Sequence, residues 1–397
     1  MIHQIAKYIE LVAAMGAFCG IAYNLLCLWS AASFLRERTS AAEGAHPTHP
    51  VSILKPLKGT DPEMYESFRS HCQQDYPEFE IIFGVSDAND LAIQQVERLK
   101  IEFPQRAIRL MVCPENLGAN TKVSNLAQMA RDARYEHFVV NDSDIRVGPH
   151  YLRNVVMPLA DAKVGLVTCL YRGVPASTLG SRLESIGIST DFAPGVLTAR
   201  FLEKGIRFGL GSTLALRRSD LKAIGGFESF ADYLADDYEL GKRIASLGLR
   251  VELSKEIVET FLPAYSFAGF VQHQLRWART IRASRFWGFL GLIFTFALPW
   301  VVLAMLASRG AVWAWGLLAV ACCVRLFAAV VAGRAVLHDR HTYSPLWLIP
   351  LRDLIAPVVW LASFAGAKIV WRGDRFQLKD GRLVTVSDKR THSAESP

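Results

Sequence analysis

Charged residues are scarce in this sequence. They make up 20% of its 397 residues, whereas about 25% is usual in soluble proteins. The shortage is local, because residues 11–35 and 286–308 contain no Asp, Glu, Lys or Arg. Each of these runs is longer than the about 20 residues that a helix needs to cross a bilayer. The sequence therefore predicts an integral membrane protein with a soluble centre.

Several common functional motifs are also missing. The seven cysteines show no Cys-x-x-Cys spacing, which argues against a zinc site and favours free thiols in a reducing compartment. There is no Gly-Lys-Ser/Thr phosphate loop, no dinucleotide-binding glycine pattern and no nucleophile elbow of a Ser-His-Asp hydrolase. No basic patch interleaved with aromatic residues is present, so nucleic acid is not an expected partner.

Two further apolar segments are interrupted by charge. Residues 310–333 contain Arg325, and we interpret them as another candidate span. Residues 346–367 contain Arg352, Asp353 and two prolines. This last segment fits a broken span, a re-entrant hairpin or an interfacial helix.

Basic residues flank the first two apolar runs on the side of the central region. Arg36 and Arg38 follow the first run, and Arg279, Arg282 and Arg285 precede the second. By the positive-inside tendency, the central domain is expected to face the cytoplasm. The first run is too long for a signal-peptide core and lacks a clear cleavage site, so an uncleaved anchor is expected. The net charge of +7 suits anionic head groups or an anionic small molecule.

The central region alternates between strand-like and helix-like patterns. Such alternation predicts an α/β fold with βαβ units and a mostly parallel, Rossmann-like sheet. The predicted strands are 51–54, 79–85, 108–113, 138–141, 164–168 and 212–216, and the predicted helices are 64–72, 91–101 and 122–133.

Two acids, Asp142 and Asp144, directly follow the predicted strand 138–141. Carboxylates in that position are costly unless a cation or solvent compensates them, and ligands of such sheets bind where strands end. Mg²⁺ or Mn²⁺ is usually held by one or two carboxylates, with phosphates completing its shell. The pattern therefore favours a cation-held diphosphate, with an ordinary turn as the alternative.

Asp87 lies just after another predicted strand, 79–85. At the carboxyl end of a strand, its carboxylate is placed to accept hydrogen bonds from a nucleobase or a ribose. The alternative, a turn-forming Asp in Ser-Asp-Ala-Asn-Asp, remains open.

Asp236 and Asp237 open a further helical pattern. Acids in a first turn stabilise a helix through its dipole, and this alone would explain them. Adjacent acids also repel, which raises the pKa of one of them and suits it to take a proton from an alcohol. Our choice for that general base is Asp237.

Arg276 and Trp277 stand in a basic, aromatic stretch just before the second apolar run. Both residue types are expected in the belt at a membrane interface. The functional alternative places the guanidinium near a leaving diphosphate and the indole against an acceptor.

Taken together, these segments resemble the family 2-like and family 21 glycosyltransferases of the ceramide glucosyltransferase type. Within that group, the chain is most similar to the bacterial hopanoid-biosynthesis branch, whose members are thought to transfer N-acetylglucosamine from its UDP form to bacteriohopanetetrol. The matching stretches are 51–59, 75–77, 84–87, 120–126, 142–147, 164–168, 235–238 and 276–277.

The resemblance implies a GT-A fold and an inverting mechanism. By position, Asp87 would contact the uracil or ribose, Asp142 and Asp144 would handle the metal and diphosphate, and Asp237 would be the base. The substrate-binding set that it implies is Asp87, Lys122, Asp142, Asp236, His273, Arg276 and Trp277, with Asp142 and Asp144 as metal ligands. His273 departs from the family pattern, which has Gln or Arg there, so its role is open.

We therefore hypothesise a membrane-bound, inverting glycosyltransferase. Its partners would be a UDP-sugar, Mg²⁺ or Mn²⁺, the bilayer and a lipid acceptor. The leading version transfers N-acetylglucosamine to bacteriohopanetetrol. The alternatives are transfer of glucose to ceramide and a processive polysaccharide synthase, and a catalytically inactive nucleotide-binding scaffold is a more remote one.

The expected organisation has five parts. A transmembrane anchor (1–35) and a linker (36–50) precede a cytoplasmic GT-A domain (51–285). C-terminal membrane segments (286–371), with two to three spans or a re-entrant part, precede a polar tail (372–397). The expected location is the bacterial inner (cytoplasmic) membrane, with several passes.

Overall fold

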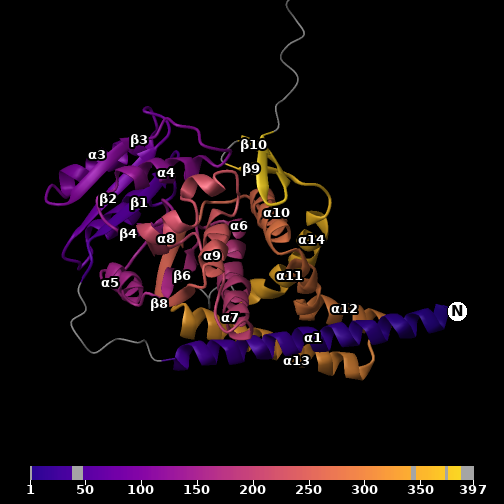
Figure 1. The fold of residues 1–397 in the computed structure, drawn as a ribbon. Helices are drawn as coiled ribbons and strands as arrows, with labels where there is room; N and C mark the ends of the chain where they lie inside the picture. Colours follow the sequence, from indigo (N-terminus) through magenta and orange to yellow (C-terminus); the bar gives the residue numbers. More distant parts are fainter. Residues whose placement is uncertain (1, 38–47, 341–345, 372–373, 386–397) are drawn as a thin grey trace, which may run out of the picture.

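The computed structural model describes residues 2–37, 48–340, 346–371 and 374–385. Figure 1 shows an α/β body beside a group of long helices. Most of the predicted linker, residues 38–47, and the end of the predicted polar tail, residues 386–397, lie outside the described residues.

The body is built on one large sheet. Its strands are β1 (Val51–Leu57), β2 (Phe79–Val85), β3 (Ala107–Val112), β4 (His137–Val140), β5 (Ile145–Arg146), β6 (Val164–Val174), β7 (Leu214–Arg217) and β8 (Arg250–Phe261). They lie side by side in the order β3-β2-β1-β4-β7-β6-β8-β5. Strands β1 to β4, β6 and β8 run in one direction, whereas β5 and β7 are antiparallel to their neighbours. The prediction of a mostly parallel sheet is confirmed.

Helices cover both faces of this sheet. One apolar core joins it to α2 (Met64–Cys72), α3 (Ala92–Glu102) and α5 (Tyr151–Val156). The core on the other face joins it to α4 (Thr121–Asp132), α7 (Ala193–Leu202) and α9 (Asp236–Ser246). Every residue of β1 and β2 is buried, as expected for strands between two helical layers, and this explains their nearly continuous apolar sequences.

Further elements complete the body. They are η1 (Met157–Ala160), α6 (Leu179–Gly187), the π-helical turn η2 (Ile188–Phe192), α8 (Arg218–Ala223), η3 (Phe227–Phe230) and α10 (Phe267–Ser284). Strand β8 was not predicted, because Glu252, Lys255, Glu256 and Glu259 break its apolar pattern.

The apolar runs form helices beside the body. Helix α1 (Ile2–Arg36) packs along α12 (Ala297–Ala307) and α13 (Val312–Val330) (Figure 1). Within the described ranges, three helical stretches are long and apolar enough to cross a membrane, namely 4–36, 312–336 and 346–363. The last contains α14 (Ile349–Ser363), so the segment with two interrupting charges forms a helix with Pro357 inside it.

The second apolar run contains no charged residue, and its length would allow one helix to cross a bilayer. In the structure this run is not one straight helix. It divides into α11 (Phe286–Gly291), η4 (Leu292–Thr295) and α12, and the two halves are bent by 51° around Phe296. This shape fits a broken span or a re-entrant loop. Among the described residues, the number of candidate spans is therefore three, or four if the bent pair is one span.

A small antiparallel sheet follows α14, in a part of the chain where no strand was predicted. It contains β9 (Lys368–Trp371), β10 (Asp374–Lys379) and β11 (Arg382–Thr385). Ile369, Phe376, Leu378 and Leu383 pack there against Leu234, two residues before Asp236. Figure 1 shows this sheet beside α10, on the side of the body away from α1.

Candidate active site

A cavity of about 1270 Å³ runs between the sheet and the membrane helices. One part of its wall is formed by loops after the carboxyl ends of strands, which is where open α/β sheets bind ligands. The predicted site residues in its wall are Lys122, Asp142, Asp144, Asp236, Asp237, His273, Arg276 and Trp277. Residues from four separate predicted segments therefore meet at one cavity.

Lys122 joins two of the acidic segments. Its Nζ atom lies 2.8 Å from Asp142 Oδ1 and 3.0 Å from Asp236 Oδ2. Burial alone would lower the pKa of this lysine, but the carboxylates of Asp142 and Asp236 outweigh burial and raise it above its ordinary value. Lys122 is therefore a fixed positive charge between the loop after β4 and the first turn of α9.

Asp237 is held by two backbone amides. Gly211 N donates to its Oδ2 at 2.8 Å and Tyr238 N donates to its Oδ1 at 2.7 Å. A Cβ atom on Gly211 would lie 3.2 Å from Asp142 Oδ2 and 3.3 Å from Asp237 Oδ2. Both carboxylates thus reach the same glycine, and a side chain at this position would crowd both of them.

The pKa of Asp237 is raised to about 6, first by burial and then by the adjacent charge of Asp236, with Lys122 acting in the opposite direction. A carboxyl group with such a pKa is ionised near neutral pH, yet it is a stronger base than an ordinary aspartate. The arrangement can therefore accept a proton from a hydroxyl group in the cavity.

Asp144 lies beside the other end of the acidic loop. It accepts a hydrogen bond of 2.5 Å from Thr260 Oγ1 on β8. Burial and the charge of Asp142 raise its pKa to about 6. Because the charge of Asp142 disfavours the ionisation of Asp144 in the same cavity wall, the pair is compatible with a cation between these residues and a ligand.

The fit to Mg²⁺ or Mn²⁺ depends on this pair. Within the part of the chain that the structure describes, no group of three or more His, Cys, Asp or Glu residues is arranged to hold a metal. A Mg²⁺-type site that uses one or two carboxylates and completes its shell with phosphates needs no such group. Asp142 and Asp144 therefore fit a cation that arrives with a diphosphate, and they do not form an all-protein cage.

Lys55 is a site residue that sequence reasoning missed. It is fully buried on β1, and its Nζ donates to the backbone carbonyl of Asp142 at 3.0 Å. Burial lowers its pKa to about 7, against the opposing effect of Asp144 and Asp142. The available signal was a lysine directly after the apolar predicted strand 51–54, because a buried charge needs a partner.

Helix α10 carries His273, Arg276 and Trp277 to the cavity. The Trp277 ring lies 5.8 Å from Phe192 and 5.6 Å from His273, between ring centroids. His273 Nδ1 is 3.3 Å from Glu184 Oε1 on α6. Glu184, which is 2% exposed, was not predicted and gave no motif signal.

The structure does not bring Asp87 into the cavity wall. Asp87 is exposed after β2, and its Oδ1 accepts a hydrogen bond of 2.9 Å from Asn89 N, as in a turn. Its neighbour Ser86 donates to the cavity-lining Asn125 at 2.8 Å. Asp87 therefore lies near the cavity's edge, and the turn alternative describes its present contacts.

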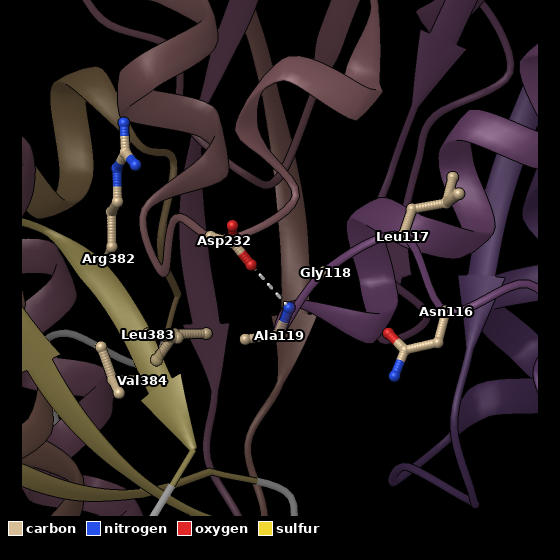
Figure 2. A pocket seen from close by; sticks show the side chains of 8 residues that line it. All are labelled: Asn116, Leu117, Gly118, Ala119, Asp232, Arg382, Leu383 and Val384. Atoms are coloured by element: carbon tan, nitrogen blue, oxygen red, sulfur yellow. Dashed lines mark hydrogen bonds between the residues drawn. The ribbon is translucent and has the colours of Figure 1, made fainter.

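A separate shallow hollow lies where the C-terminal sheet meets the loop before α4 (Figure 2). Ala119 N donates to Asp232 Oδ1 at 2.9 Å, and Asn120 Nδ2 donates to Tyr233 O at 2.8 Å. Leu383 N donates to Asp232 O at 2.7 Å. These bonds fix the approaches to Lys122 and Asp236 against β11.

Comparison with a solved structure identifies the class of fold. The chain superimposes on a mannosyltransferase from Pyrobaculum calidifontis, solved with GDP-Man and Mn²⁺, with a TM-score of 0.54 and 21% identity. The match covers 90% of this chain and 99% of the other. The body therefore has a GT-A-like fold, here joined to long apolar helices.

Residues 12–384 match the family described as Glycosyl transferase family 21, and the chain belongs to that family. It is a glycosyltransferase. It is 25% identical over 363 residues to ceramide glucosyltransferase 1 of Caenorhabditis elegans, which covers 86% of this chain and 74% of the relative. A ceramide glucosyltransferase of Komagataella phaffii is 39% identical over 101 residues, or 24% of this chain and 20% of that one.

Proposed function

We propose that the protein transfers one hexose from a UDP-sugar to the hydroxyl group of a membrane lipid. The similarity to ceramide glucosyltransferases over 84–86% of this chain favours UDP-glucose and ceramide over the N-acetylglucosamine and hopanoid version. The observation that carries the proposal is that one cavity joins a cluster of acids to apolar helices. A water-soluble donor and a lipid acceptor can meet there.

The donor end would be the acidic part of the cavity. Lys122 is placed to hold Asp142 and Asp236 in position and to face a diphosphate, and Lys55 fixes the loop of Asp142 from behind. Asp142 and Asp144 would hold Mg²⁺ or Mn²⁺, which when bound supplies positive charge to a departing diphosphate. Arg276 would add a second positive group on the same side. Asp87 would contact the base or ribose at the cavity's edge.

Asp237 would act as the general base. Its oxygens accept bonds from Gly211 N and Tyr238 N, so the carboxylate is oriented without blocking its remaining lone pairs. It would remove the proton of the lipid hydroxyl, whose oxygen attacks the anomeric carbon on the face opposite UDP. Trp277 would form a wall beside that acceptor.

The catalytic domain, residues 51–285, would face the cytoplasm. Arg279, Arg282 and Arg285 precede the first helix after this domain, and positive residues favour the cytoplasmic side. Arg279 and Arg282 also donate to backbone carbonyls just after α14, so the basic cluster ties the two ends of the membrane region together.

Product analysis tests the proposal. The purified protein is incubated with UDP-glucose or UDP-N-acetylglucosamine, Mn²⁺, and ceramide or bacteriohopanetetrol, and the lipids are analysed by mass spectrometry. We expect ceramide to gain a single hexose, with one UDP released per product. A long polymer would indicate a processive synthase, and N-acetylhexosamine on the hopanoid alone would restore the hopanoid version. Failure to release UDP with any lipid would support a scaffold.

A further inference from the structure

Part of the cavity wall carries charge inside the membrane-side helices. We call this part the membrane chamber and define it by Glu184, Asp191, Gln274, Arg325, Arg352 and Asp353, all of which line the cavity. Arg325 lies on α13 and Arg352 and Asp353 on α14, both within candidate spans. Ionisable groups at such places are costly, and they usually mark a pathway or a binding site.

The positive and negative groups of the chamber pair with one another. Arg325 donates to Asp353 at 2.8 and 2.9 Å and to Asp191 at 2.5 Å. Arg352 donates to Gln274 at 2.8 Å, and its Nε lies 3.5 Å from Asp191 Oδ2. The two guanidinium groups thus face three carboxylates when Glu184 is included. The chamber has no surplus positive charge to bind a phosphate.

The chamber is connected to the acceptor side of the proposed active site. Gln274 Nε2 donates to Glu184 Oε2 at 2.6 Å, and Glu184 Oε1 faces the His273 ring, which is next to Trp277. Burial raises the pKa of Tyr171 above its ordinary value, and the charges of both Glu184 and Asp237 raise it further. Tyr171 therefore lies within electrostatic reach of the chamber and of the proposed base.

Two buried polar atoms in this region are left without hydrogen bonds. Arg352 Nε and His273 Nδ1 have no hydrogen-bond partner among the described residues, although each lies within ion-pair distance of an acid. A buried donor without a hydrogen bond is destabilising, so a ligand group or an ordered water is expected beside them. Arg352 is 8% exposed, so bulk solvent does not supply the missing hydrogen bond.

The surroundings of the chamber are apolar. Phe289, Leu292, Phe296, Val359 and Trp360 line the same cavity. The π-helical turn η2, which brings Thr190 and Asp191 to the wall, inserts an extra residue into the helix between α6 and α7. Such turns are frequent at functional sites. A polar pocket with an apolar approach suits an amphiphile.

We propose that the membrane chamber binds the head of the lipid acceptor, and that it selects an uncharged head with hydroxyl or amide groups over an anionic phosphate head. The carboxylates accept bonds from hydroxyl or amide hydrogens, and Arg352 donates to an amide or hydroxyl oxygen. The hydrocarbon chains lie along the apolar wall. This inference rests on the proposed function, because it assigns the acceptor of that reaction.

Binding is tested without sugar transfer. The purified full-length protein is irradiated with a photoactivatable ceramide whose diazirine is next to the head, and labelled peptides are mapped by mass spectrometry. We expect labelling of η2, α10 or α14 that an excess of unlabelled ceramide suppresses and an equal excess of phosphatidylglycerol does not. Equal suppression by both lipids, or labelling confined to the outer faces of α1 and α13, would overturn the proposal.

Kinetics of matched variants give a second test. Gln274→Ala and Glu184→Gln are expected to raise the KM for ceramide at least 10-fold while changing the KM for the UDP-sugar less than 2-fold. The control is Glu256→Gln, a carboxylate that bonds Asn154 and does not line the cavity. Unchanged acceptor KM in both folded variants would contradict the proposal. Specific labelling without any sugar transfer would refute the proposed function and leave the chamber assignment standing.

Discussion

At the scale of single residues, the site depends on how a few charges are compensated. Lys122 pairs with Asp142 and Asp236, whereas the hydrogen bonds that the structure gives to the carboxylate of Asp237 come from backbone amides. The two neighbouring acids of α9 thus have different surroundings. Asp236 is therefore suited to a positioning role, and Asp237 is suited to take a proton.

Replacing Asp237 with Asn should remove the base and keep the shape. Loss of general-base catalysis typically costs 10²–10⁴-fold, so kcat should fall by about that factor. Binding of UDP, measured by calorimetry, should stay within about 3-fold of the parent because the side chain is isosteric. Asp236→Asn is the informative comparison, since it breaks the contact with Lys122 and should weaken UDP binding. Substantial turnover by Asp237→Asn would contradict the base assignment.

The pH dependence of turnover should reflect the pKa of Asp237. Its pKa is raised to about 6, so the active carboxylate form is complete well above that pH and is lost as the pH falls through it. The rate should drop about 10-fold per pH unit below about 6. The measurement is kcat/KM for the donor between pH 4.5 and 8. A rate that stays constant down to pH 4.5 would exclude Asp237 as the titrating base.

At the scale of elements, the C-terminal sheet supports the catalytic loops. Strand β11 bonds the segment Asp232–Leu234, and this segment in turn holds the loop before Lys122. Lys58, after β1, pairs with Asp374 of β10 at 2.9 Å. Residues far apart in the chain therefore meet at one edge of the cavity, to which Leu234 and Val370 both contribute.

Weakening this sheet should impair the site from a distance. Phe376→Ala removes a side chain that is 6% exposed and packs with Leu234, and such truncations cost about 3 kcal/mol. We expect a lower Tm and a higher KM for the UDP-sugar. Val384→Ala, on the exposed side of β11, is the matched control and should leave both unchanged. Equal effects of the two variants would argue against a supporting role.

The sequence predicted elements where local pattern and burial agree. The strands at 51–54 and 79–85 and the helix at 64–72 are present because apolar residues fill both faces of the sheet. The missed elements depend on distant partners. Strand β8 carries charges that pair across the sheet, as Glu259 does with Arg172, and the C-terminal sheet is stabilised by Leu234.

The same distinction holds for the site. Acids at strand ends and at the start of a helix were found from position alone, whereas Glu184 gave no motif signal and is recognised only through the groups that it faces. Asp87 shows the opposite case, since its position after a strand favoured a ligand contact as much as a turn, and its side chain lies outside the cavity wall. Local sequence indicates which residue types are present, and tertiary contacts decide their surroundings.

At the scale of the whole molecule, close packing of small residues joins the anchor to the other helices. A Cβ atom on Gly20 of α1 would lie 2.5 Å from Ala297 Cα, and one on Gly16 would lie 2.4 Å from the Trp300 ring. Small residues at such contacts let helix backbones approach closely in a membrane. The anchor is therefore an integral part of the bundle and not only a tether.

Enlarging Gly20 should separate these helices. Gly20→Val is expected to lower the free energy of unfolding by about 1–3 kcal/mol through overpacking. Gly316→Val, on α13 where nothing lies within 4 Å of an added Cβ, should change it by less than about 0.5 kcal/mol. Thermal unfolding of both variants in the same detergent measures the difference. Equal Tm values would show that α1 is not tightly packed against α12.

The pairing of Arg325 with Asp353 and Asp191 has a consequence for biogenesis. During synthesis Arg325 reaches the translocon before Asp353 exists, and an arginine at the middle of a lone inserting helix costs roughly 2.5–3.5 kcal/mol. Of the two carboxylate partners of Arg325, only Asp191 has already been synthesised at that point. Asp191 is in position to pair with Arg325 only once its own domain has folded. Insertion of the C-terminal segments should therefore wait for the nascent globular part, so that folding in water precedes assembly in lipid.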